Sequence, residues 1–79
     1  MKVKILNVTD LQGNPKEERI WETERIIIKS HLKIGNQISL IYPDGEKYRI
    51  TTSATDIHIE GTNLTIKTKN SIYNLQIIY

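Results

Sequence analysis

Branching at Cβ is the feature of this sequence that most restricts its fold. Isoleucine, valine and threonine account for 25 of the 79 residues, whereas alanine, the best helix former, occurs once, at Ala54. Side chains branched at Cβ fit pleated, half-buried surfaces and lose rotamer freedom in helices. The chain is therefore expected to be all-β. Because it contains no Phe and only one Trp, its core is expected to be mainly aliphatic.

The length of the chain predicts a single small domain over residues 1–79. A domain of this size buries only about 60% of the surface that its unfolded chain exposes, so its stability should be modest. The absence of Cys excludes disulfides, a thiolate nucleophile and thiolate metal sites. A small secreted domain usually needs disulfides, and no segment has the apolar length of a signal peptide or membrane helix. We therefore expect a cytoplasmic location and no membrane partner.

Strands are expected wherever apolar and polar residues alternate or β-branched residues cluster. The expected strands cover residues 2–9, 19–29, 38–42, 47–51, 56–60, 64–69 and 72–79. The clearest turn is Pro43-Asp44-Gly45, where Pro presets φ and Gly adopts the left-handed conformation, so a hairpin should form there. A break is expected at residues 53–55.

Residues 15–24 carry two opposing signals. Asn14, Pro15 and the acidic residues that follow resemble the start of a helix, with Asn as cap and Pro at the first helical position. Ile20, Trp21 and Thr23 favour a strand instead. We expect a strand and retain a short helical turn as the alternative.

Short strands at regular spacing are typical of a small barrel or sandwich. Consecutive strands are usually neighbours, so we expect a small SH3-like barrel or a strongly bent antiparallel meander of about five to seven short strands. Residues 32–40, which surround Gly35, are similar to an entry segment common in such barrels. An OB-like barrel would need a helix between strands, and the sequence after Gly35 offers no place for one.

Three segments resemble a known group of proteins: Tyr42-Pro43-Asp44-Gly45 and residues 50–53 and 68–73. They are similar to short proteins encoded by phages and mobile elements of low-GC Gram-positive bacteria. The resemblance covers the C-terminal half of the chain and consists of common hairpin residues. It implies a bacterial, phage or mobile-element origin. It implies no activity and transfers no functional residue, because the group has no assigned activity.

The sequence carries no catalytic or cofactor signature. Asp56, His58 and Glu60 alternate along one strand face, opposite Ile57 and Ile59, which are expected in the core. The three polar residues are of types that bind metals or transfer protons. Adjacent positions on a flat strand do not converge on one point, so an ordinary solvated face is the simpler interpretation. The Ser and His residues show no triad spacing, and each Gly fits a turn rather than a phosphate-binding loop. We expect no enzyme, no cofactor and no metal.

An apolar last strand and a lone Trp point to a protein interface. The apolar residues are Leu75, Ile77, Ile78 and Tyr79, which at a sheet edge would offer unpaired backbone groups to a homodimer or another protein. The same strand would be equally suited to closing the barrel against the first strand. Trp21 is a candidate anchor, although a lone Trp is more often a core residue. Protein–protein binding or self-association is the expected function.

Nucleic-acid binding is the alternative function. Alternation places basic side chains in pairs on strand faces: Lys2, Lys4, Lys47, Arg49, Lys67 and Lys69. If these strands were neighbours, the lysine-rich face would contact phosphates, with Tyr48, Tyr73 or Trp21 stacking on bases at its rim. Lysines on solvent faces also maintain solubility, acidic neighbours would weaken the patch, and alternation turns Tyr48 inward.

Overall fold

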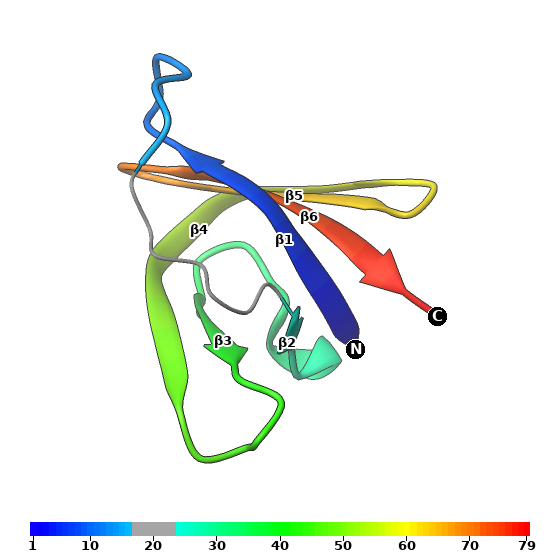
Figure 1. Ribbon diagram of the computed structural model, residues 1–79. Coiled ribbons are helices and arrows are strands. Elements are labelled where there is room, and N and C mark those ends of the chain that lie inside the picture. The colour runs from blue at the N-terminus through cyan, green and yellow to red at the C-terminus, as the bar shows by residue number, and fades with distance from the viewer. Residues whose placement is uncertain (17–23) are drawn as a thin grey trace.

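The computed structural model describes residues 1–16 and 24–79, which form a closed antiparallel barrel (Figure 1). Within this part of the chain, the strands are β1 (Lys2–Thr9), β2 (Glu24–Ile26), β3 (Gln37–Ile41), β4 (Tyr48–Glu60), β5 (Asn63–Thr68) and β6 (Ile72–Ile78). A short 3-10 helix, η1 (Lys29–His31), follows β2. Each strand pairs with the next, and β6 pairs with β1 to close the barrel. The expected all-β fold, a small SH3-like barrel, is confirmed.

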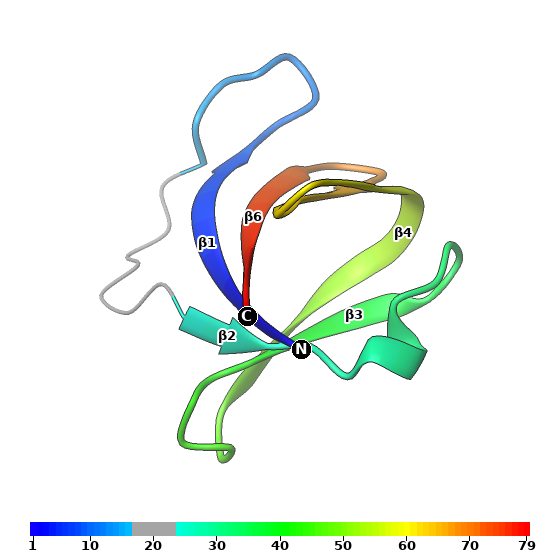
Figure 2. The same cartoon turned by 90° about the vertical axis from the view of Figure 1, so that its right-hand side faces the viewer.

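β4 is one long strand, so the expected break at residues 53–55 is wrong. Its first part pairs with β3 and its second part with β5, and the register shifts between Ala54 and Asp56. A bulge of this kind bends a strand and increases its twist. Figure 2 shows that β4 curves along its length, which lets it pair with both β3 and β5. The bend replaces the break, and two of the expected strands become one.

A second register shift lies in β1, between Ile5 and Asn7. It leaves Leu6 and Asn7 both exposed, whereas Ile5 and Val8 remain buried on either side. The shift therefore turns an apolar side chain, Leu6, onto the outer surface of the barrel. Simple alternation would have assigned only one of the two residues to that surface.

Of the strand expected over residues 19–29, the described part contains β2 (Glu24–Ile26), which ends before the expected end at residue 29. Residues 17–23 lie outside the described part of the chain. Most of the segment for which a strand and a helical turn were both considered therefore falls outside it. After Ile26 the chain leaves the ladder and enters η1 at Lys29. Met1 and Ile27 exchange two backbone hydrogen bonds, of 2.8 and 2.9 Å between nitrogen and oxygen. These bonds fix the start of η1 beside the first residue of β1.

The hairpin between β3 and β4 forms at Pro43-Asp44-Gly45, as expected. Gly45 has a φ of 75°, which disfavours side chains with a Cβ, and its N–H donates to the carbonyl of Tyr42 at 2.9 Å. Asp44 Oδ1 accepts hydrogen bonds from the backbone N–H groups of Glu46 (2.9 Å) and Lys47 (3.3 Å). These two bonds, that of Glu46 above all, lower the pKa of the Asp44 carboxyl.

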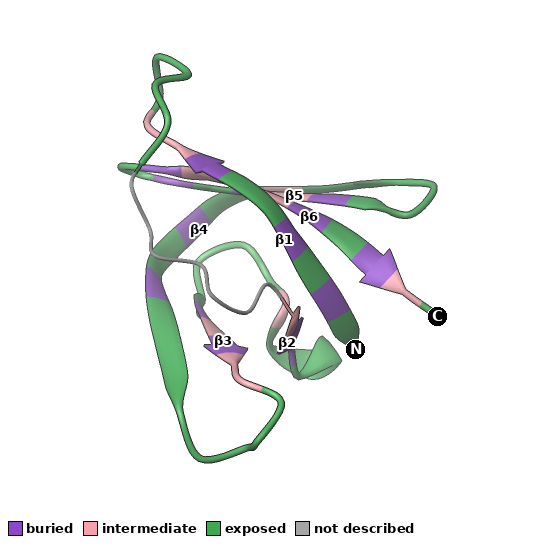
Figure 3. Ribbon diagram, viewed as in Figure 1, coloured by how far each residue is buried: buried purple, intermediate pink, exposed green. Residues whose placement is uncertain are grey.

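The core is aliphatic, as the composition predicts, with one tyrosine. Its buried members come from every strand except β2, together with Ile27: Val3, Ile5, Val8, Ile27, Ile38, Leu40, Ala54, Leu64, Ile66, Tyr73, Leu75 and Ile77. Buried and exposed segments alternate along β1 and β6 in Figure 3, which is the pattern of strands with one face on a core. β6 therefore has a neighbouring strand along each edge and core residues on its inner face.

Two residues expected on the inner face are exposed. Tyr48 is 62% exposed and Ile59 is 50% exposed, although both were assigned inward by alternation. They lie near the two ends of β4, the longest strand. Tyr48 pairs with Ile41, and the adjacent pair joins the buried Leu40 to Arg49, so Tyr48 lies on the outer face of β4 and its inward assignment is wrong. Ile59 pairs with the buried Leu64 and does lie on the inner face, but it stands next to the turn into β5, where the packed core ends.

Candidate functional site

β6 is not an open edge, which resolves the two roles considered for it. It pairs with β5 on one side and with β1 on the other. Leu75 and Ile77 are buried in the core, and Ile77 keeps only a small exposed part. Ile78 is half-buried, whereas Tyr79 is 94% exposed. Trp21, the other expected anchor, lies outside the described residues.

A hollow of about 350 Å³ lies where β1 begins, β6 ends and the β4–β5 hairpin turns. We call it the mouth groove. Its lining residues are Met1, Lys2, Lys29, Ile59, Ile77, Ile78 and Tyr79. The two ends of the described chain lie side by side here in both Figure 1 and Figure 2, in agreement with the pairing of Lys2 and Ile78. Most of the lining is apolar, and two lysines complete it.

Strand geometry explains why apolar side chains gather at this mouth. Ile59 pairs across the hairpin with Leu64, and Ile77 pairs across the barrel seam with Val3. Leu64 and Val3 are fully buried core residues, so their partners continue the inner face toward the barrel end. The N–H of Ile77 donates to the carbonyl of Thr62 at 2.7 Å, which fixes the end of β6 against the β4–β5 turn. The groove is an outward extension of the core.

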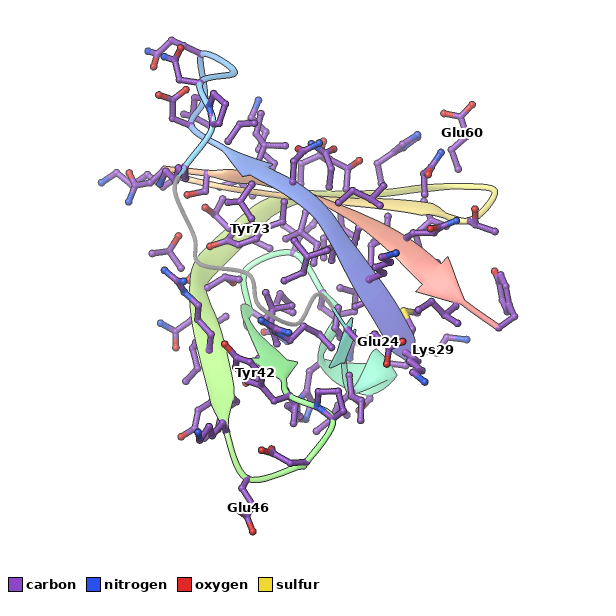
Figure 4. All side chains as sticks on the ribbon, viewed as in Figure 1. Glu24, Lys29, Tyr42, Glu46, Glu60 and Tyr73 are labelled. Atoms are coloured by element: carbon purple, nitrogen blue, oxygen red, sulfur yellow. The ribbon has the colours of Figure 1, made fainter. Side chains whose placement is uncertain are left out.

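The charged side chains of the mouth groove, Lys2 and Lys29, are both cationic. Lys2 Nζ lies 3.5 Å from Glu24 Oε2, and about half of each of these side chains is exposed. Exposed pairs of this kind contribute about 0–1 kcal/mol, so Lys2 can exchange its partner easily. Among the described residues, no carboxylate lies within ion-pair distance of Lys29, and no Asp or Glu side chain lines the groove. Figure 4 shows Lys29 and Glu24 near the start of β1 in that view.

A second hollow, of about 370 Å³, lies on the outer surface of β1, β4, β5 and β6. We call it the outer hollow. It is lined by Leu6, His58, Glu60, Asn63, Leu64, Thr65, Asn74 and Leu75. A row of paired positions crosses it, in which His58 lies opposite Thr65 and Thr65 opposite Asn74. Asn74 Nδ2 donates to Asn7 Oδ1 at 2.6 Å, which continues the polar row onto β1.

The strand face with Asp56, His58 and Glu60 does not form a three-residue cluster. His58 Nε2 and Glu60 Oε2 are 3.6 Å apart on exposed side chains, whereas Asp56 pairs across the sheet with Lys67. In the part of the chain that the structure describes, no three His, Asp or Glu side chains group closely enough to hold a metal ion. The outer hollow thus presents hydrogen-bonding groups rather than a set of metal ligands.

The basic residues of the expected nucleic-acid face are distributed over separate places. Lys2 and Lys4 lie toward the start of β1, and Lys67 lies on β5, with β6 between these strands. Lys67 pairs with Ile72, and Ile72 pairs with Thr9 at the other end of β1. Lys69 lies in the adjoining turn, and Lys47 and Arg49 lie at the β3–β4 hairpin.

The aromatic residues do not join these basic residues into one surface. Tyr48 neighbours Lys47 and Arg49 and is exposed, whereas Tyr73 is a core residue. Stacking on a base requires an exposed ring beside the phosphate contacts. Among the described residues, only one of the three basic pairs has such a neighbour from the expected set.

One hydroxyl–amine contact was not expected from the sequence. Lys16 Nζ donates to Ser71 Oγ at 2.5 Å, and Ser71 is buried. Lysine beside serine is an arrangement found in some hydrolases. Here neither residue lines either hollow, and the N–H of Ser71 donates to Thr68 Oγ1 at 3.2 Å. The contact holds the loop over residues 10–16 against the β5–β6 turn.

Sequence reasoning identified Ile78 and Tyr79 as surface candidates but missed Met1, Lys29 and Ile59. Ile59 was assigned to the core, whereas it lies beside the β4–β5 turn and is half-exposed. Met1 and Lys29 meet in the groove because Met1 pairs with Ile27, two residues before Lys29. No local sequence signal encodes that long-range pairing.

Comparison of the chain with family models, with curated proteins and with solved structures finds no match. The resemblance to phage and mobile-element proteins stays a prediction. In the described residues, no helix has the length and apolar character needed to cross a membrane.

Proposed function

We propose that the protein is a non-enzymatic binding module that recognises a polypeptide through the mouth groove. The observation that carries the proposal is the exposure of large apolar side chains around a concave surface. Tyr79 and Ile59 are exposed there beside Ile78, although buried positions remain the preferred place for such side chains. Contiguous exposed apolar surface is a common mark of interaction sites.

The physical basis of binding is the removal of this apolar surface from water. Each Å² of apolar area that is buried stabilises a complex by about 25 cal/mol before the costs of association are subtracted. Tyr is enriched among the residues that dominate binding energies, because it offers a large apolar face and a polar tip. Tyr79 is therefore the proposed anchor, with Ile59 and Ile78 beside it.

Two adjacent residues of β4 provide a matched test, because they face different hollows. A photo-crosslinking amino acid would replace Ile59 in one variant and His58 in another, and each variant would be irradiated in cells and as purified protein. We expect covalent adducts from position 59 and few from position 58. Adducts of twice the mass of the chain would indicate self-association, and other masses a different partner. Equal yields from the two positions, or none from 59, would contradict the proposal.

Nucleic-acid binding remains the alternative hypothesis, although the separation of the basic pairs gives it no specific support. Titration of fluorescent single-stranded DNA, duplex DNA and RNA at low and moderate salt would test it. Saturable binding that weakens steeply with salt, and that is lost in the Lys47→Glu, Lys67→Glu double variant, would favour it.

A further inference from the structure

The charge of the mouth groove indicates which kind of polypeptide it takes. We infer that the groove binds an acidic, apolar segment of another protein, and not a second copy of this chain. The inference rests on the proposed function and adds the chemistry of the partner. The partner segment would supply an apolar side chain that enters the hollow and carboxylates that pair with the two lysines.

The first observation is the sign of the charges around the hollow. Lys2 and Lys29 line it, and no Asp or Glu does, among the described residues. A carboxylate placed beside Lys29 would gain an attraction that no described residue of the chain now supplies. A basic segment would be repelled by the same two groups. Complementary charge of this kind selects partners and speeds their encounter.

The second observation concerns Lys2, whose present partner can be replaced. Its ion pair with Glu24 is 3.5 Å long and lies on half-exposed side chains. Water and salt screen such a pair strongly, so exchanging Glu24 for a carboxylate of the partner has a small cost. Glu24 then acts as a weak competitor for the site, since it neutralises part of the charge that the partner would use.

The same charges disfavour a symmetric dimer through this groove. In an interface with twofold symmetry, each patch meets its own copy. Lys2 and Lys29 of one chain would face the same two lysines of the other chain, next to the apolar contact. Like charges brought together at an interface oppose association. A different protein, with acidic residues beside its apolar anchor, has no such conflict.

The size of the hollow favours a short segment. Its volume of about 350 Å³ lies near the lower end of the range for ligand pockets, about 300–1,000 Å³. A hollow of this size accommodates one or two large side chains of a peptide. The flanking lysines lie close enough to contact residues adjacent to that anchor.

The experiment is a selection from a display library of short random peptides, carried out on three forms of the full chain. These are the original protein, the charge-reversal variant Lys2→Glu, Lys29→Glu and the groove variant Ile59→Ser. We expect the original protein to enrich peptides with Asp or Glu beside Leu, Ile, Phe or Trp. Charge reversal should switch the enriched flanking residues from acidic to basic, and Ile59→Ser should lose the enrichment.

A synthetic peptide with the enriched sequence then gives a quantitative readout by fluorescence polarisation. Its dissociation constant should rise at least about tenfold in the charge-reversal variant. The control is the Lys47→Glu, Lys67→Glu variant, which changes the net charge equally but leaves the groove intact, and which should bind as the original does. Circular dichroism would confirm that all the variants fold.

The outcomes separate failure of the inference from failure of the proposed function. Enriched apolar peptides without charge preference, unaffected by charge reversal but lost in Ile59→Ser, would overturn the acidic partner and leave the binding site standing. A dimer in sedimentation velocity that Ile59→Ser abolishes would replace the acidic partner with a second copy. Absence of enrichment, or enrichment that Ile59→Ser does not affect, would overturn both.

Discussion

The mouth groove and the outer hollow share β1, β4 and β6 and have nearly the same volume, about 350 and 370 Å³. Their chemistry nevertheless differs, because the first is lined mainly by aliphatic and aromatic side chains and the second mainly by amide, hydroxyl and charged groups. Ile59 and His58, which are consecutive in β4, belong to different hollows. The pleat of a single strand therefore separates the two surfaces.

The difference shows that an inward orientation and burial are separate properties. Leu64 and Ile59 face each other across the β4–β5 hairpin, yet Leu64 is fully buried and Ile59 is half-exposed. The two residues are directly paired, at the same distance from the turn, and only the Ile59 side chain borders the mouth groove. We interpret the groove as the place where apolar side chains of the inner face lie beyond the packed core. These side chains are therefore exposed and available for binding.

The largest expected effect is a difference in the free energy of unfolding between variants of these two paired residues. Leu64→Ala should lower the free energy of unfolding by about 2–5 kcal/mol, because it leaves a cavity in the core. Ile59→Ala should cost only about 1 kcal/mol, because half of that side chain is already in water. Urea unfolding of the two variants measures the difference. Equal costs would show that Ile59 is a core residue and that the groove is part of the packed interior.

The next effect concerns binding rather than stability. Tyr79→Ser should weaken binding of an acidic, apolar peptide about tenfold, because it removes the proposed anchor. Its free energy of unfolding should change by less than about 0.5 kcal/mol, since the side chain is almost fully exposed. Leu6→Ser, a matched change in the outer hollow, should leave binding unaltered. If Leu6→Ser weakened binding more than Tyr79→Ser, the binding site would lie in the outer hollow.

A smaller effect is expected at the edge of the groove. Glu24→Gln removes the carboxylate that now pairs with Lys2 at 3.5 Å. The freed lysine should then strengthen binding of the acidic peptide by about two- to fivefold, and the gain should shrink as salt is added. Isothermal titration calorimetry at two salt concentrations measures both quantities. Weaker binding of this variant would mean that Glu24 itself contacts the partner.

The smallest effect is expected in acid and arises from two loops outside both hollows. The Asn14 backbone N–H is the main cause that lowers the pKa of Asp10, and the Glu46 N–H has the same effect on Asp44. A pKa that is lower in the folded than in the unfolded state gives stability that is complete above the unfolded value of about 3.9. That stability is lost as the pH falls through the folded value.

Urea unfolding between neutral pH and pH 3 tests this origin of acid sensitivity. We expect the double variant Asp10→Asn, Asp44→Asn to show a weaker loss of stability with falling pH than the original chain. His58→Gln, which changes the outer hollow, serves as the control and should leave this part of the profile unchanged. An identical acid profile for the double variant would assign the sensitivity to other carboxylates.

Local patterns predicted much of the barrel, because they act through neighbouring residues. The alternation in residues 2–9 and the Pro43-Asp44-Gly45 turn produced the strand and hairpin that they indicated. Closure of the barrel by β6 was one of two roles that the sequence left open, since an apolar strand suits a closed seam as well as a free edge.

The candidate site could not be predicted in the same way, because it depends on long-range register. The pairing of Ile59 with Leu64 places Ile59 beside the β4–β5 turn, and the pairing of Met1 with Ile27 brings Lys29 to the groove. Alternation assigns a side chain to a face but does not say where the core ends along the strand. Ile59 was therefore assigned to the core, and the groove that it lines was missed.

The most direct test is a methyl NMR titration of the full chain with the acidic, apolar peptide selected on it. Ile59 and Ile78 report on the mouth groove, and Leu6 reports on the outer hollow. We predict saturable shifts of the two isoleucine methyl groups and little change at Leu6. Shifts centred on Leu6, with Ile59 and Ile78 unmoved, would contradict the assignment of the mouth groove as the binding surface.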